Sequence, residues 1–282
     1  MLCAAVQGLF ACGKEERPAD IPTGPSSPEN VDPGSLEFNI GIVPCGETFK
    51  DGWEQGDAIG LFAVESGTGL QSSGNLMDNL KLEYDGSGWS CGDAVSISWP
   101  AENGVDIYAY YPYNENLDNP ADIAFAVPED QSGLEDFSGY AILTASASGV
   151  ESTLPVNLDF TPLMSIVEII LPPCGKGCGP SDDLTVTLKG VQTSVTVGDG
   201  WSAVPSGVSA DVKMRSSGKS DAGYAFRAVL PAQTLPEGSS LFEFVQDGRT
   251  YGDDEILDKD TELLQGGSKS FTRNTLSAGI SG

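Results

Sequence analysis

The chain has 282 residues, of which 41 are acidic and 14 are basic, so its formal net charge is −27, and it contains no histidine. This acidity argues against partners such as nucleic acid or an anionic lipid surface, because both need clustered Lys and Arg. The absence of histidine excludes a Ser-His-Asp triad, a Cys-His dyad and any His-ligated metal site.

Residues 1–12, MLCAAVQGLFAC, are uncharged, mostly apolar and too short to span a bilayer as a helix, as in a secretory signal. Leu9-Phe10-Ala11-Cys12 resembles the end of a bacterial lipoprotein signal, in which the cysteine becomes the first mature residue and carries the lipid. We therefore expect lipidation of Cys12 and attachment to the outer membrane through acyl chains. The alternative is an ordinary apolar signal that contains a cysteine.

Residues 13–35 follow as a proline-rich segment. Gly13-Lys14-Glu15-Glu16 resembles the short acidic tag that sends some outer-membrane lipoproteins to the cell surface. Prolines then stand at positions 18, 22, 25, 28 and 33. Such a segment predicts an extended, solvated tether between the lipid and the folded part of the chain.

From residue 36 onward, short runs rich in Val, Ile, Tyr, Phe and Thr alternate with Gly, Pro, Asn and Asp. No long run keeps a helical stripe without a Gly or Pro, so the pattern predicts an all-β fold built of β-sandwiches. The predicted strands are Leu36–Val43, Asp57–Val64, Leu80–Tyr84, Ala94–Ser98, Val105–Tyr111, Asp122–Val127, Tyr140–Ala145, Leu154–Phe160, Leu163–Leu171, Leu184–Leu188, Ser194–Val197, Tyr224–Leu230, Leu241–Gln246 and Lys269–Leu276.

The best domain boundary is the Pro- and Gly-rich segment Leu171–Ser181, LPPCGKGCGPS, which separates two strand-rich blocks. We expect an N-terminal sandwich over residues 36–173 and a C-terminal sandwich over residues 174–282. Both blocks have the size of ordinary domains.

Four cysteines lie outside the signal segment, at Cys45, Cys91, Cys174 and Cys178. Export places them in an oxidising compartment, where disulfides persist. Cys174 and Cys178 flank a flexible Gly-Lys-Gly loop, so we expect them to bond to each other, which leaves Cys45 with Cys91. The alternative is a four-cysteine zinc site, although the usual C-x-x-C knuckles are absent.

Two further segments have both a functional and a structural interpretation. Asp247–Asp260 holds enough carboxylates for a calcium site but lacks the spaced ligands of an EF-hand, so a solvated acidic loop is the default. Tyr108–Tyr113 is either a sugar-stacking platform or a core strand, in which Tyr108 and Tyr110 share one face and Tyr111 takes the other. Nothing picks out a carboxylate pair for glycoside hydrolysis, and no catalytic, cofactor-binding or metal-binding residue is predicted.

Several segments together resemble the fimbrillin family. Trp53–Ala63, WEQGDAIGLFA, is similar to the family's GD-x-IG signature, and Ile97–Tyr113 contains its W-P and V-D-x-Y-A-Y-Y-P-Y patterns. Val156–Phe160 matches a V-x-L-x-F strand, and Tyr224–Thr234 resembles a strand ending in L-P-Q-T, with an inserted alanine. The resemblance covers about residues 36–276.

This resemblance implies two tandem transthyretin-like Greek-key β-sandwich domains on a surface lipoprotein that serves as a pilus subunit of stalk, anchor or tip type. In polymerising members, a protease removes the first strand after an arginine, and the open groove accepts a strand from a neighbouring subunit. By analogy, the first strand here is Leu36–Val43. The donor is the C-terminal segment, with Phe271, Arg273 and Leu276 as candidate residues.

The sequence departs from this pattern in three ways. No arginine lies between Arg17 and Arg215, and Lys50 is the only basic residue between the first strand and the GD signature. Thr161-Pro162 replaces a family histidine, and the predicted donor segment alternates poorly between apolar and polar residues. The missing cleavage site and the poor alternation favour an uncleaved, lipid-anchored subunit or an independent adhesin over a stalk pilin, whereas the lost histidine changes the expected function little.

We therefore predict a fimbrillin-like lipoprotein, exposed on the surface of the outer membrane, that acts in adhesion without catalysis and needs no cofactor. Its partners would be other fimbrial subunits, joined by strand exchange, and ligands on host or bacterial surfaces. The alternative is a carbohydrate-binding module of a glycan-capture system, which exposed rings at Trp89, Trp99, Trp201 and Tyr113 would favour. A glycosidase is a third hypothesis and requires two carboxylates that face each other across a cleft.

Overall fold

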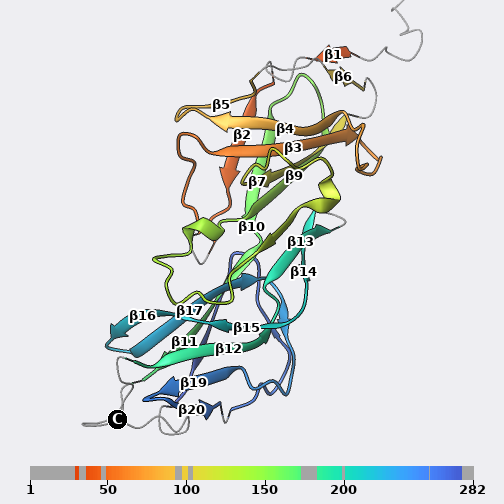
Figure 1. Cartoon of the computed structure of the whole chain (residues 1–282). Coiled ribbons are helices and arrows are strands. Elements are labelled where there is room, and N and C mark those ends of the chain that lie inside the picture. Colours follow the sequence, from red (N-terminus) through yellow and green to blue (C-terminus); the bar gives the residue numbers. More distant parts are fainter. Residues whose placement is uncertain are drawn as a thin grey trace, which may run out of the picture.

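The computed structural model describes residues 29–31, 36–45, 49–92, 97–100, 104–172, 183–198, 201–253 and 255–274. Within these residues the chain is built of strands joined by loops and two 3-10 turns, η2 (Pro120–Asp122) and η3 (Ser138–Tyr140) (Figure 1). The all-β prediction is therefore confirmed. In this part of the chain, no helix has the length and apolarity that crossing a membrane demands.

A seven-stranded sheet with the order β2-β10-β9-β7-β3-β4-β5 forms the first half of the fold, in the upper part of Figure 1. β2 lies parallel to β10, and the other neighbours are antiparallel. The bounds are β2 (Phe38–Ile42), β3 (Ala58–Glu65), β4 (Met77–Tyr84), β5 (Trp89–Ser90), β7 (Val105–Tyr111), β9 (Leu143–Val150) and β10 (Val156–Pro162).

The core of this sheet follows from residue alternation. Val105, Ile107 and Ala109 of β7 are fully buried in one cluster, together with alternate residues of β3 and β10. Tyr110 belongs to a second cluster, and Tyr108 packs against that cluster from the same side of the strand. Tyr111 is half-buried and packs against both clusters.

The second half, lower in Figure 1, contains two four-stranded sheets, ordered β16-β17-β11-β22 and β15-β12-β19-β20. Their apolar residues share the second cluster, which also contains Phe62 and Tyr110 from the first half. The bounds are β11 (Met164–Leu171), β12 (Thr185–Val191), β15 (Ala210–Lys213), β16 (Arg215–Ser220), β17 (Gly223–Pro231), β19 (Phe242–Gln246), β20 (Arg249–Gly252) and β22 (Ser268–Thr272).

Three small sheets complete the fold. β8 (Ala124–Ala126) pairs with β13 (Ser194–Gly198), which pairs with β14 (Ser202–Ser206), and β18 (Thr234–Leu235) pairs with β21 (Thr261–Glu262). β1 (Glu29–Val31) pairs with β6 (Ile97–Trp99). Residues 29–31 of the predicted tether are therefore bound to the fold, because Val31 is an apolar residue that buries its side chain in the first cluster.

The predicted domain boundary differs from the sheet pairing. The predicted boundary puts β11 in the first block, but β11 pairs with β17 and β22 of the second half. Only Leu163 separates β10 from β11, so sheet membership changes there and not at residue 174. The physical reason is that one extended segment crosses between the sheets, and Pro162, which cannot donate to a ladder, marks the crossing.

A buried glutamine joins the two halves. The Gln131 side chain is fully buried; its Nε2 donates to the Val229 carbonyl at 2.9 Å, and its Oε1 accepts from the Val229 N–H at 2.9 Å. The amide thus makes the two hydrogen bonds that a neighbouring strand would make. It satisfies backbone groups that would otherwise be buried without partners.

Candidate functional site

β2 is an edge strand bound to the fold through β10. Its ladder continues past both strand ends, because the Val156 N–H donates to the Glu37 carbonyl at 2.8 Å and the Val43 N–H donates to the Phe160 carbonyl at 2.9 Å. An edge strand held by one neighbour is the kind of element that chains exchange.

The side chains of β2 alternate between core and solvent. Phe38, Ile40 and Ile42 pack half-buried against the first cluster, and Asn39 between them is exposed. The outer edge is covered in part by Trp53, whose Nε1 donates to the Ile40 carbonyl at 3.1 Å. β2 therefore packs one face against the first cluster and also accepts a hydrogen bond on its free edge.

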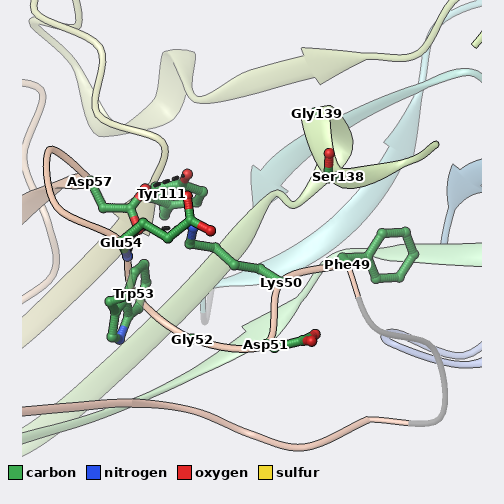
Figure 2. A pocket seen from close by; sticks show the side chains of 10 residues that line it. All are labelled: Phe49, Lys50, Asp51, Gly52, Trp53, Glu54, Asp57, Tyr111, Ser138 and Gly139. Atoms are coloured by element: carbon green, nitrogen blue, oxygen red, sulfur yellow. Dashed lines mark hydrogen bonds and ion pairs between the residues drawn. The ribbon is translucent and has the colours of Figure 1, made fainter. Parts of the chain in front are cut away.

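A pocket of about 730 Å³ is lined by Trp53 and, on the same side, by the carboxylate of Asp57 (Figure 2). Asp57 accepts from the Glu54 N–H at 2.6 Å and from the Tyr111 hydroxyl at 2.9 Å, and its Oδ2 lies 2.8 Å from Lys50 Nζ. The lining residues are Phe49, Lys50, Asp51, Gly52, Trp53, Glu54, Asp57, Tyr111, Ser138 and Gly139.

Electrostatics in this pocket fix Asp57 as a charged group. Burial opposes ionisation, but the hydrogen bonds from the Glu54 amide, Lys50 and Tyr111 outweigh it, so the pKa of Asp57 is lowered. Burial, together with the bond to Asp57, raises the pKa of Tyr111. The general acid of a glycosidase needs a raised pKa, so Asp57 does not fit that role.

Lys50 is enclosed by the same pocket. Its side chain is 12% exposed, and Nζ lies 5.3 Å from the centre of the Tyr111 ring and 5.9 Å from that of Trp53. This lysine is the only basic residue at which a protease specific for basic residues could cut between β2 and the GD signature. In the folded chain its ammonium group is paired with the Asp57 carboxylate and lies over the rings of Tyr111 and Trp53.

β22 lies at the edge of the sheet β16-β17-β11-β22, parallel to β11. Phe271 and Arg273 are both 8% exposed, whereas Ser270, Thr272 and Asn274 are exposed. The donor segment therefore alternates between buried and exposed residues, and an arginine takes one of the buried positions. Sequence reasoning missed this alternation because it counted only apolar residues.

The Arg273 side chain is paired in the interior. Its Nε donates to Asp253 Oδ1 at 2.9 Å, and the side chain of that aspartate is 1% exposed. Arg273 Nη1 lies 3.2 Å from Glu255 Oε2, and the guanidinium carbon lies 5.5 Å from the ring centre of Phe242 and 5.7 Å from that of Phe271. The side chains of Phe271 and Arg273 thus contact residues of the same chain. Leu276, the third candidate donor residue, lies outside the described residues.

The other predicted residues are distributed as follows. Cys12, Cys174 and Cys178 lie outside the described residues. Cys45 and Cys91 are half-buried, and their pairing stays a prediction.

The acidic segment does not form the expected solvated loop throughout, because Asp253 is buried against Arg273. Within the described residues, no cluster of three or more acidic or cysteine side chains has the arrangement of a metal site.

Burial also answers the question of an aromatic platform. Trp99 is 2% exposed, Trp201 is 9% exposed, and Trp89 and Tyr113 are half-buried. Trp53 packs edge-on against Trp89, Tyr111 and Phe160 at 5.0–5.4 Å. These rings serve packing, so the observation expected of a carbohydrate-binding surface is not met.

Two arrangements escaped sequence reasoning. The Asp57, Lys50 and Tyr111 contacts had a signal in the GD signature, which marked the position but not its partners. The Arg273–Asp253 pair spans distant segments and had no local signal.

Comparison with known proteins agrees with the fold. A family model described as Fimbrillin-like matches residues 47–277. The chain is 25% identical over 242 residues to the "Putative fimbrium subunit Fim1C" of Bacteroides uniformis, covering 82% of this chain and 75% of that relative. It is 28% identical over 138 residues to the "Putative fimbrium tip subunit Fim1C" of Bacteroides ovatus, covering 44% of this chain and only 25% of that relative.

Two solved structures share the fold. A "putative cell adhesion protein" from Bacteroides ovatus has a TM-score of 0.59 at 17% identity, over 89% of this chain and 94% of that one. Another with the same description, from Bacteroides uniformis, has a TM-score of 0.52 at 20% identity, over 79% of this chain and 89% of that one.

Proposed function

The chain belongs to the fimbrillin-like family, and we propose that it is a terminal fimbrial subunit that keeps its first strand and adheres through contact surfaces without catalysis. The family and its relatives support a fimbrial subunit at the cell surface with a role in adhesion. By terminal we mean an anchor, tip or adhesin subunit, which would need only one neighbour in the fibre.

The observation that carries this proposal is that β2 pairs with β10 and that the segments flanking it offer no arginine for cleavage. No arginine separates the tether from β2 or β2 from the rest of the chain, and Lys50 is enclosed by Asp57, Trp53 and Tyr111. A groove that stays filled by its own strand cannot accept a strand from another subunit there.

Membrane attachment is the second part of the proposal. The Leu9–Cys12 signal supports a lipid on Cys12, and the segment that follows leads to β1, which is bound to the fold by β6. The lipid would hold the folded part at the outer membrane, and contacts with other fimbrial subunits or surface ligands would use the remainder.

The test is the intact mass of the mature protein from outer membranes, before and after treatment with an arginine-specific protease. We expect a lipid-modified chain that begins at Cys12 and remains monomeric and uncut before residue 44. The Cys12→Ala variant should leave the membrane fraction.

A matched control is Pro44→Arg, which places an arginine at an exposed position two residues after the end of β2. The protease should release the first strand from this variant only. A native N-terminus beyond Val43, or SDS-resistant multimers of the unmodified chain, would show that the first strand is removed and the proposal is wrong.

A further inference from the structure

We propose that the chain is built to carry tension between its two ends, with β10 and β11 as a continuous spine and β2 and β22 as two joints loaded in shear. The inference rests on the proposed function only in that a fimbrial subunit experiences pulling forces. Its evidence is the strand register, and its test uses the isolated chain.

The spine is a single extended segment. β10 and β11 are interrupted only by Leu163, so residues 156–171 run from one half of the fold to the other (Figure 1). At about 3.3 Å per residue, this segment could span up to about 50 Å. Both halves of the molecule are thus connected by one covalent line that is hydrogen-bonded along its length.

The two terminal strands attach to this spine in the same way. The register of β2 on β10 pairs five residues in parallel, and the register of β22 on β11 also pairs five in parallel. The ends of the joints match as well. The Ile166 N–H donates to the Gly267 carbonyl at 3.0 Å, and the Arg273 N–H donates to the Ile170 carbonyl at 3.0 Å, as Val156 and Val43 do in the β2 joint.

Parallel pairing decides how a pull is distributed. The chain enters β2 at the N-terminal end of the spine and leaves β22 at its C-terminal end, so tension draws each strand along its own axis. All the hydrogen bonds of a joint then share the load at once, because the parallel ladder is evenly spaced along the strand. A strand peeled from one end would lose its bonds one at a time.

Each joint is reinforced where force enters. The last residue of the β22 ladder is Arg273, which is held by the buried carboxylate of Asp253. On the other side, the chain reaches β2 only after β1, which is paired with β6 and buries Val31. A force applied to the C-terminus therefore acts first on the Arg273–Asp253 pair, and a force applied to the N-terminus acts first on β1. Only then does it load the β22 and β2 ladders.

The experiment is single-molecule force spectroscopy of the full chain, held by its two termini. Ile40→Ala and Leu80→Ala form the matched pair, because both truncate a half-buried aliphatic side chain of the first cluster, but only Ile40 lies in a loaded strand. The loss of unfolding free energy of each variant is measured separately by chemical denaturation.

We expect Ile40→Ala to lower the rupture force and Leu80→Ala to leave it at the wild-type value. Forced unfolding follows the barrier along the pulling direction and not overall stability. The inference would be overturned if the rupture force fell in both variants in proportion to the unfolding free energy that each one loses. The outcome does not depend on membrane attachment or retention of β2 in the cell, which the mass measurement decides.

Discussion

At the scale of single residues, the GD-x-IG signature has a steric basis. The Tyr110 ring is 1% exposed and crosses directly over Gly60, where an added Cβ would lie 2.2 Å from Tyr110 Cε1 and 2.6 Å from Asn79 Oδ1. The Tyr110 hydroxyl donates to that same Asn79 oxygen at 2.8 Å and accepts from the Asn114 N–H at 3.1 Å. Glycine is therefore required by a neighbouring ring and not by a turn.

Gly60→Ala is expected to destabilise the chain by about 3 kcal/mol, because the new methyl group forces a well-packed ring to move. Denaturant unfolding followed by tryptophan fluorescence measures this cost. In a Tyr110→Ala background the same substitution should cost much less, since the clashing ring is gone. Equal costs in both backgrounds would contradict the steric explanation.

Asp57 predicts a pH dependence of stability. Its pKa is lowered in the folded chain from the ordinary value of 3.8, so its contribution is complete above pH 3.8 and is lost as pH falls through the lower, folded-state pKa. Asp57→Asn should cost about 2 kcal/mol at neutral pH, because Lys50 loses its charged partner.

The measurement for Asp57 is the unfolding free energy of wild type and Asp57→Asn between pH 7 and about pH 3. The gap between the two proteins should be constant near neutrality and should shrink at the acid end. A gap that stays the same at every pH would show that the charge of Asp57 contributes nothing.

At the scale of elements, the sequence predicted the strands that bury apolar residues. Val105–Tyr111 is found as predicted, β11 and β19 differ by one residue at their N-terminal end, and β3 is shifted by one residue at both ends. The strands it missed are short or polar. β16, RSSGKS, is exposed along almost all its length and is strand only because it pairs with β17. Such edge strands are set by their neighbours and leave no hydrophobic pattern.

β22 shows the same limit from the opposite side. The strand itself could be predicted from the sequence. The ion pair between Arg273 and Asp253 that holds it could not, because the two residues lie in separate segments and no local sequence pattern indicates their contact. The buried pair also makes the strand sensitive to the loss of one partner, because a lone carboxylate would remain in the interior.

Arg273→Met is therefore expected to cost about 3–5 kcal/mol, since the buried Asp253 loses its countercharge. Amide hydrogen exchange should accelerate in residues 268–272 before it does in β7. The double variant Arg273→Met with Asp253→Leu removes both charges and should recover most of the loss. No recovery in that variant would mean that the ion pair is not what holds β22.

At the scale of the whole molecule, composition and strand pattern predicted the fold class and the motifs predicted the family, but not the connection between the halves. The Pro-Gly segment at 171–181 was the strongest interruption in the sequence, yet β11 had already joined the second half before it. Loop signals report where a chain turns, whereas sheet membership depends on which strands pair across long distances.

The one-residue link at Leu163 has a consequence for how this chain tolerates change in length. Because side chains alternate faces along an extended strand, inserting or deleting a single residue there would exchange the two faces of β11. Met164, Ile166 and Val167 are all 2% exposed or less, so both faces of the strand are packed at this point and neither has space for the side chains of the other. We therefore expect insertions to be tolerated in the surface hairpins, whereas the number of residues between β10 and β11 cannot change.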